Sequence, residues 1–162
     1  MPSDIQKYRP EFIVIQFGIN DANYWQTDVK CPRVSPEAFK ANLIEIIGRA
    51  KIFGARKIIL NTNHLQNCHD IFPNTVNLTL HDTSFAYNEI IRQAYLIYKN
   101  DVSKFTQKCN VYLNDIEKWI KEEKIDYKSM TLDGVHLNRF GHDQYFRNMV
   151  KVLKKEIKGW LR

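Results

Sequence analysis

The sequence predicts a doubly wound α/β domain built around a parallel sheet. Short apolar runs rich in β-branched residues have the length of strands, longer amphipathic segments have the length of helices, and the two alternate along the chain. Runs that are apolar on both faces are typical of strands buried inside a parallel sheet. In this fold class ligands bind beyond the carboxyl ends of the strands. Reactive side chains are therefore expected just after strands.

The first predicted strand covers residues 12–17, where only one residue is polar. A loop follows, and Ser35, Pro36 and Glu37 then supply an N-cap, a first-turn proline and an acidic residue for a helix. We expect this helix to end before Gly54, because glycine favours helix termination. Strand, loop and helix form the first unit of the alternation.

Two more strands are predicted farther along the chain. Residues 56–62 are rich in branched apolar side chains and predict the second strand, and residues 111–114 predict the third. Between them lies an amphipathic segment with Asp82 or Thr83 as its expected N-cap. The segment therefore predicts a helix that joins two parallel strands.

The last predicted helices are a short one over residues 116–123 and one that Asn138 caps. The formal net charge of +6 raises the question of a nucleic-acid partner, because clustered basic residues favour phosphate binding. Basic residues of the last helix alternate with apolar ones, which is typical of a solvated face: they are Lys151, Lys154, Lys155, Lys158 and Arg162. We therefore predict no nucleic-acid partner, and binding by this helix stays the weaker alternative.

Length and composition predict one domain over residues 1–162, because 44% of the residues are hydrophobic and 26% are charged. No apolar run has transmembrane length, and the first residues lack the pattern of a secretory signal, so the expected location is cytoplasmic. Cys31, Cys68 and Cys109 are odd in number and far apart, which favours reduced thiols over disulfides.

Two motifs carry the chemistry that the sequence predicts. Asp133 stands three positions before His136 on a turn that leads into the last helix, so its carboxylate can hold one imidazole nitrogen while the other faces a cleft. Gly18 and Asn20 come just after the first strand, where an amide side chain can donate a hydrogen bond to an oxyanion. These residues make up most of an ester-hydrolysing site, without its nucleophile.

The same residues carry a resemblance to a known family. Residues 17–22 and 133–138, with Gly141 and His142 just inside the last helix, resemble the third and fifth sequence blocks of the SGNH (GDSL-type) hydrolases. The resemblance extends over nearly the whole chain. Either block alone is a weak signal, but two in the right order and about the usual distance apart are fairly specific.

The resemblance implies a flavodoxin-like three-layer α/β/α sandwich that hydrolyses esters with a Ser-His-Asp triad and needs no cofactor. By this resemblance His136 is the general base, Asp133 orients it, and Asn20 with the Gly18 block serves the oxyanion. The implied partner is a small-molecule ester, either a simple acyl ester, an acetylated sugar or a lysophospholipid.

One part of the family pattern has no counterpart. The Gly-Asp-Ser block that carries the nucleophile, and the block that supplies a backbone oxyanion donor, do not precede residue 12. We therefore expect the first strand, helix and strand of the family to be missing, through a truncated gene model, a deliberate shortening or a true loss. The chain alone is then expected to be inactive, with an uncovered sheet edge through which copies can associate.

Other serines and histidines are less convincing. Residues 78–84 loosely imitate a nucleophile turn but lack its glycine, so Ser84 is expected in a helix cap. Four residues are dense enough to suggest zinc, yet their spacing matches no standard ligand pattern: His64, Cys68, His69 and His81. We predict no metal site.

Four residues near the strand ends are predicted to line the substrate cleft: Asp21, Tyr24, Trp25 and His64. For Asp21 a turn at the strand end is the preferred interpretation, and for the two aromatic residues local packing is an equally good one. A noncatalytic carbohydrate- or ester-binding module with the same fold stays open as the alternative function.

Overall fold

The computed structural model describes residues 4–25, 27, 30–68, 70–72, 77–99 and 109–156. Within these ranges lie three strands and five α-helices: β1 (Phe12–Ile15), α1 (Ile19–Ala22), α2 (Pro36–Ile52), β2 (Lys57–Asn61), α3 (Leu80–Lys99), β3 (Asn110–Asn114), α4 (Ile116–Glu122) and α5 (Arg139–Glu156). Two short 3-10 helices, η1 (Gln6–Tyr8) and η2 (Tyr127–Met130), accompany them.

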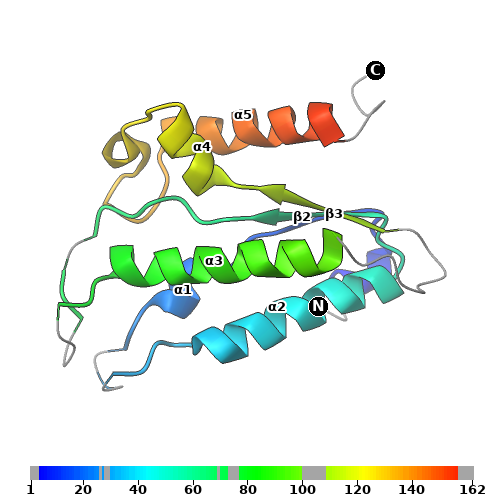
Figure 1. The fold of residues 1–162 in the computed structure, drawn as a ribbon, viewed down its shortest axis with the longest axis horizontal. Coiled ribbons are helices and arrows are strands. Elements are labelled where there is room, and N and C mark those ends of the chain that lie inside the picture. Colours follow the sequence, from blue (N-terminus) through cyan, green and yellow to red (C-terminus); the bar gives the residue numbers. More distant parts are fainter. Residues whose placement is uncertain are drawn as a thin grey trace.

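The three strands form one parallel sheet in the order β1-β2-β3, so the predicted α/β class is confirmed. Helices α2 and α3 cover one face of this sheet and α5 covers the other (Figure 1). Ile58 and Leu60 of the central strand β2 join the core beneath α2 and α3, whereas Ile59 packs in the cluster with Leu153 of α5. These three residues of β2 are fully buried, as expected for a strand between two helical layers.

Local signals set most of the boundaries as predicted. The hydroxyl of Ser35 accepts a hydrogen bond from the backbone N–H of Ala38 at 3.2 Å and caps α2. Asn138 caps α5 in the same way, because its Oδ1 accepts from the N–H of Gly141 at 3.0 Å. Helix α2 ends at Ile52, before Gly54, as predicted.

Helix α3 begins earlier than predicted. Its first residue is Leu80, so Asp82 and Thr83 lie inside the helix and do not precede it. The carboxylate of Asp82 turns back and accepts hydrogen bonds from the backbone N–H and the hydroxyl of Thr79, at 3.1 and 2.6 Å. Thr79 is the N-cap, because its hydroxyl also accepts a hydrogen bond from the backbone N–H of Asp82 at 3.3 Å, and the two residues together form a capping box.

Strand β1 is an edge of the sheet within the described residues, because it pairs with β2 alone. Val14 and Phe17 are 42% and 53% exposed, although the pattern of their segment predicts burial on both faces. A groove of about 450 Å³ lies between the segment after β1, which contributes Phe17, and α2, which contributes Phe39 and Leu43. The strand end is also shorter than predicted, since β1 stops at Ile15.

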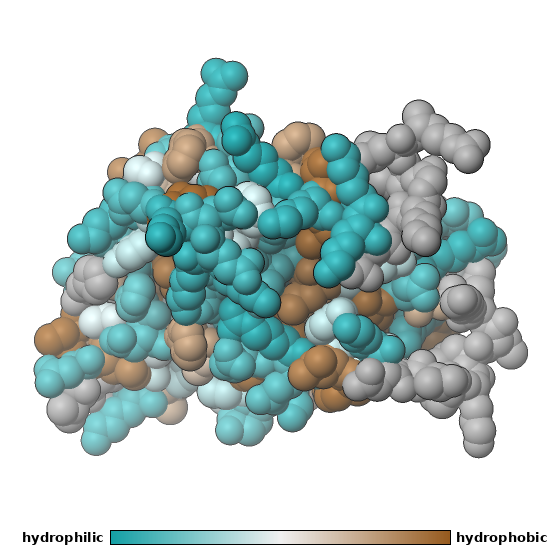
Figure 2. All heavy atoms as spheres, turned by 45° about the horizontal axis from the view of Figure 1, so that its top comes forward, coloured by the Kyte–Doolittle hydropathy of each residue, from teal (hydrophilic) through white to brown (hydrophobic). Residues whose placement is uncertain are grey.

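The helical layer formed by α5 presents a largely polar exterior. Figure 2 shows the molecule with this side turned forward, and hydrophilic side chains cover most of the visible face, with scattered hydrophobic ones between them. Lys151 lies 4.4 Å above the ring of Trp119 and 3.5 Å from the carboxylate of Glu123. Lys158 and Arg162 of the predicted basic face lie outside the described residues. Among the helices described, none combines the length and apolar character needed to cross a bilayer.

Candidate active site

The turn before α5 holds an aspartate and a histidine in direct contact. Oδ1 of Asp133 accepts hydrogen bonds from the backbone N–H groups of Val135 and His136, at 3.0 and 2.7 Å, and Oδ2 lies 2.7 Å from Nδ1 of His136. The hydrogen bond from the backbone of His136, followed by those from its ring and from Val135, holds the pKa of Asp133 well below its usual range. The carboxylate therefore stays ionised, and Nε2 is the imidazole nitrogen left for a reacting group.

This pair is open to solvent. The side chains of Asp133 and His136 are 55% and 78% exposed. Gly134 between them has φ +88°, and a Cβ at this position would lie 2.6 Å from the backbone oxygen of Asn67. Only glycine fits both the left-handed backbone and this close approach.

The end of β1 leads directly into the second motif. Gly18 has φ +125° and starts the four-residue helix α1, and its N–H donates to the carboxylate of Asp21 at 3.1 Å. A Cβ on Gly18 would lie 2.5 Å from Nδ2 of Asn63. Asn20 lies on α1 and is exposed. Asp21 therefore closes the strand-end turn, and it also lines the groove between Phe17 and α2.

The segment after β2 contacts both motifs. Nδ2 of Asn63 donates to the carbonyl oxygen of Phe17 at 3.1 Å, next to Gly18. Nε2 of His64 lies 2.8 Å from the carbonyl oxygen of Val135, and the N–H of Asn67 donates to the oxygen of Gly134 at 2.7 Å. Segments far apart in the sequence thus meet at the carboxyl edge of the sheet, where Figure 1 shows α1 and the loop before α5 at the same end of the strands.

His64 is part of the interior. Its side chain is buried, with the whole residue only 3% exposed, and it lies between Val135 and Tyr145. Burial lowers the pKa of this imidazole, and the nearby His142 and His136 act in the same direction. The sequence prediction that His64 lines the cleft rested on its place after a strand. In the structure His64 is instead buried and contacts the backbone of the turn before α5.

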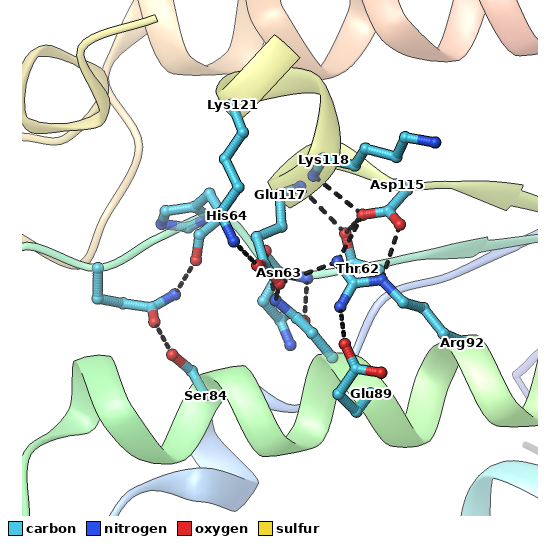
Figure 3. A network of polar contacts seen from close by, with 12 residues as sticks. Thr62, Asn63, His64, Ser84, Glu89, Arg92, Asp115, Glu117, Lys118 and Lys121 are labelled. Carbon is cyan, nitrogen blue, oxygen red and sulfur yellow. Dashed lines mark hydrogen bonds and ion pairs between the residues drawn. The ribbon is translucent and has the colours of Figure 1, made fainter. Parts of the chain in front are cut away.

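Below these loops lies a set of polar side chains that we call the buried polar layer: Asn63, His64, Asn88 and Glu117. Asn63 and Asn88 exchange hydrogen bonds, since the N–H of Asn63 donates to Oδ1 of Asn88 at 2.7 Å and Nδ2 of Asn88 returns one to the oxygen of Asn63 at 2.9 Å. Nδ2 of Asn88 also lies 2.9 Å from Oε2 of Glu117, which is 1% exposed. Figure 3 shows Asn63 in the segment after β2 close to Glu117 of α4.

Cations complete the buried polar layer. Arg92 on α3 donates to Glu117 at 3.0 Å and to Asp115 at 2.8 Å, and Lys121 donates to Glu117 at 2.5 Å (Figure 3). Burial alone would raise the pKa of Glu117, but the hydrogen bonds from Lys121 and Asn88 and the charge of Arg92 outweigh it, so the pKa is lowered. Glu117 is thus a buried, ionised and fully paired carboxylate.

The sequence patterns did not predict the buried polar layer. Asn88 and Arg92 stand four residues apart on α3, and Asp115 and Glu117 follow β3 directly. Polar residues on the buried face of a helix, together with carboxylates at a strand end, are the signal that could have identified it.

No described serine touches the histidine of the turn. Ser84 is 2% exposed, and its hydroxyl donates to Oε1 of Gln66, so the prediction of a helix cap is wrong and the residue lies inside α3. The reason is the early start of α3 at Leu80. Ser35 caps α2, and Ser129 donates to the oxygen of Asp126 at 2.6 Å. Ser3 and Ser103 lie outside the described residues.

The two aromatic residues after α1 differ in their surroundings. Tyr24 stacks on Phe72 with ring centroids 4.5 Å apart, and burial raises the pKa of its hydroxyl. Trp25 is 52% exposed, and the guanidinium of Arg33 lies 3.7 Å from the centre of its ring. Tyr24 therefore has a packing role, whereas Trp25 offers an exposed aromatic surface.

Within the described part of the chain, no three His, Cys, Asp or Glu side chains come close enough to hold a metal ion. His69 of the predicted zinc alternative lies outside that part. Cys31, Cys68 and Cys109 are free thiols.

Three solved structures superimpose on this chain over most of its length. LAE5, an alpha/beta hydrolase enzyme from the metagenome of Lake Arreo, superimposes with a TM-score of 0.68 at 19% identity, covering 94% of this chain and 64% of its own. A mutant of Axe2, an acetyl-xylooligosaccharide esterase from Geobacillus Stearmophilus, gives 0.68 at 20%, covering 94% and 63%. The acetyl xylan esterase AlAXEase gives 0.65 at 19%, covering 93% and 71%. The chain thus spans about two thirds of the length of these proteins.

A search of curated proteins finds no match to this sequence. The sequence model of the GDSL-like Lipase/Acylhydrolase family matches residues 1–149, which include both motifs of the site. Since the match covers nearly the whole chain, the protein belongs to the GDSL-like lipase/acylhydrolase family.

Proposed function

We propose that the protein hydrolyses carboxylic esters through a Ser-His-Asp mechanism in which His136 is the general base. The observation that carries the proposal is the exposed Asp133–His136 pair, with 2.7 Å between carboxylate and imidazole, at the carboxyl edge of a parallel sheet. A fixed carboxylate on Nδ1 leaves Nε2 to take a proton from an attacking hydroxyl. Membership of the family supports this chemistry.

The proposed reaction has two stages. His136 removes the hydroxyl proton as the oxygen attacks the ester carbonyl, and the resulting imidazolium is stabilised by Asp133, whose pKa is lowered. The side-chain amide of Asn20, exposed after β1 within the Gly18 block, donates a hydrogen bond to the oxyanion. His136 then protonates the leaving alcohol, and water repeats the sequence on the acyl-enzyme.

We propose that the nucleophilic serine comes from a segment that pairs with β1 at the edge of the described sheet. Ser35, Ser84 and Ser129 are all engaged elsewhere. The exposed side chains of Val14 and Phe17 support an additional strand at this edge. By this proposal the 162 residues alone are inactive, and their uncovered edge can also pair with a second copy.

We propose a small ester as the substrate, with an acetylated sugar favoured over other acyl esters. Two of the structural neighbours are named as acetyl xylan or acetyl-xylooligosaccharide esterases. The exposed ring of Trp25, which follows the Asn20 block, is the kind of surface on which a sugar ring stacks. Tyr24 and Asp21, by contrast, are held by packing and by the turn.

The test compares two forms of the protein on p-nitrophenyl acetate. The 162-residue chain should release product no faster than its His136→Ala variant, because a base without a nucleophile contributes little. An extended protein, in which an upstream in-frame segment with a Gly-Asp-Ser sequence precedes Met1, should gain an activity that a serine-directed phosphonate abolishes.

Two outcomes would overturn the proposal. A His136-dependent burst from the 162-residue chain would mean that one of its own hydroxyls is the nucleophile. A folded extended protein that binds acetylated sugars but hydrolyses none would favour the noncatalytic binding module.

A further inference from the structure

The hydrogen bonds around His64 define a single protonation state of its ring. Nε2 lies 2.8 Å from the carbonyl oxygen of Val135, and a carbonyl oxygen can only accept. Nε2 must therefore carry a proton. Burial lowers the pKa of this imidazole, so the ring is neutral near pH 7 and Nδ1 is an acceptor.

Tyr145 satisfies that acceptor. Its hydroxyl lies 3.1 Å from Nδ1 of His64, and the same oxygen accepts the backbone N–H of His64 at 2.9 Å. A phenol has one proton and two lone pairs, and the carbonyl oxygen of Thr62, at 3.4 Å, is a longer second acceptor for that proton. Donation to the nearer Nδ1 satisfies both contacts with His64. The imidazole is thus fixed by α5 on one side and by the turn before α5 on the other.

The carbonyl that His64 holds belongs to the peptide unit that enters the catalytic histidine. The oxygen of Val135 and the N–H of His136 are parts of the same peptide group, and that N–H donates to Asp133 at 2.7 Å. Because a peptide group is planar, the hydrogen bond from His64 to the oxygen of Val135 also fixes the direction of the N–H of His136 toward the carboxylate. Asn67 holds the preceding peptide in the same way, through the oxygen of Gly134.

We propose that His64 is a positioning residue that orients the Asp133–His136 pair through the peptide between Val135 and His136. For its effect on turnover this inference rests on the proposed esterase function, but its effect on the turn does not. Among the described residues the side chains of this pair are mostly open to solvent, so the contacts that hold the turn come from the segment after β2. The rigid contact from below supplies the fixed geometry that a general base needs.

Three variants separate positioning from simple burial. In His64→Gln the side-chain amide reaches the place of Nε2 and can still donate to Val135. In His64→Asn the amide ends near the place of Nδ1, so it stays polar but does not reach that carbonyl. His64→Ala removes both contacts. The Asn variant is therefore the matched control for the Gln variant.

The first readout is the pKa of the Asp133 carboxyl, which is measured by carbon NMR in the 162-residue chain. This pKa lies well below the usual range because of the hydrogen bonds from the backbone and the ring of His136 and from the backbone of Val135. We expect it to rise toward the ordinary value in the Asn and Ala variants and to stay low in the Gln variant. An unchanged pKa of Asp133 in all three variants would overturn the proposal, even if each variant were less stable.

The second readout is turnover in the extended protein. The Asn and Ala variants should lower kcat about tenfold to a hundredfold with KM nearly unchanged, because a small displacement of the base slows the chemical step more than binding. His64→Gln should recover most of kcat. Equal losses in the Gln and Asn variants would contradict positioning. Should the extended protein prove inert, the proposed function fails, while the carboxyl titration still decides the role of His64.

Discussion

The Asp133–His136 turn and the buried polar layer are both dense in charged hydrogen bonds, yet they differ in their access to water. The side chains of Asp133 and His136 are 55% and 78% exposed, whereas Asn88 and Glu117 are each 1% exposed. A base that must meet a substrate cannot be held by burial. The position of the His136 ring therefore depends on hydrogen bonds within the turn and on the buried polar layer that the turn packs against. That layer contains the buried charges, which cost free energy to remove from water.

The largest expected effects test the exposed side of this comparison, in the extended protein. His136→Ala should remove nearly all activity, and Asp133→Asn should lower kcat on the order of 10⁴-fold, because the imidazole loses its fixed tautomer. Asn20→Ala should cost about a hundredfold to a thousandfold, as expected for one lost oxyanion donor. Steady-state kinetics measure all three. An unchanged kcat in Asn20→Ala would leave that residue as a strand-end turn only.

Substitutions in the buried polar layer should lower the stability of the fold. Glu117→Ala leaves one buried N–H of Asn88 without its acceptor, while Arg92 keeps Asp115 and Lys121 is half exposed. We expect a loss of about 2 kcal/mol of unfolding free energy, the cost of an unsatisfied buried donor. Glu45→Ala is the matched control, because Glu45 pairs with Arg49 at the surface, with side chains 57% and 48% exposed. Its cost should be about 0.5 kcal/mol or less. Urea unfolding of both variants measures the difference. Similar losses of unfolding free energy would mean that the buried carboxylate stabilises the fold no more than a surface ion pair does.

The same comparison explains what the sequence could and could not predict. The turn was found because its chemistry is local: Asp133 and His136 contact each other across three positions, and Gly18 and Asn20 follow one strand. The alternation of apolar runs likewise gave the strand order in the chain and the parallel sheet. Short-range patterns of this kind are visible without coordinates.

The buried polar layer was not visible because its contacts join residues far apart in sequence. Asn63 reaches both Phe17 and Asn88, and His64 reaches Val135 and Tyr145. Nothing in the local sequence around His64 distinguishes a residue under the turn from one at a cleft mouth. Only the packing of α5 and its preceding loop against the end of β2 decides between the two.

A glycine links the exposed turn to the segment beneath it. In Gly134→Ala the new Cβ meets the backbone oxygen of Asn67 at 2.6 Å and the residue must keep φ +88°, so we expect a loss of about 2–3 kcal/mol. Gly54→Ala is the control, because Gly54 has φ +105° with no atom within 4 Å of its Cβ position. It should cost about 1 kcal/mol from backbone strain alone. Equal losses in urea unfolding would show that the contact with Asn67 is not tight.

The smallest expected effect is a pH dependence that belongs to His64. Its pKa is lowered in the folded state by burial and by the nearby His142 and His136, so the unfolded chain takes up a proton that the folded chain resists. Stability from this group is present above the unfolded pKa of about 6.5 and is lost as the pH falls from there toward the folded pKa. One such group changes the unfolding free energy by at most about 1.4 kcal/mol per pH unit.

His64→Gln should flatten that part of the stability profile, because the amide keeps the contact with Val135 but does not titrate. The measurement is urea unfolding of the wild type and the variant between pH 7 and about pH 5, chosen to span the imidazole range. His142→Gln is the control, since His142 is exposed on α5 and its removal should leave most of the slope in place. A slope that persists in the His64 variant and vanishes in the His142 variant would place the titrating group at the surface. The buried polar layer would then have no part in the acid response of the fold.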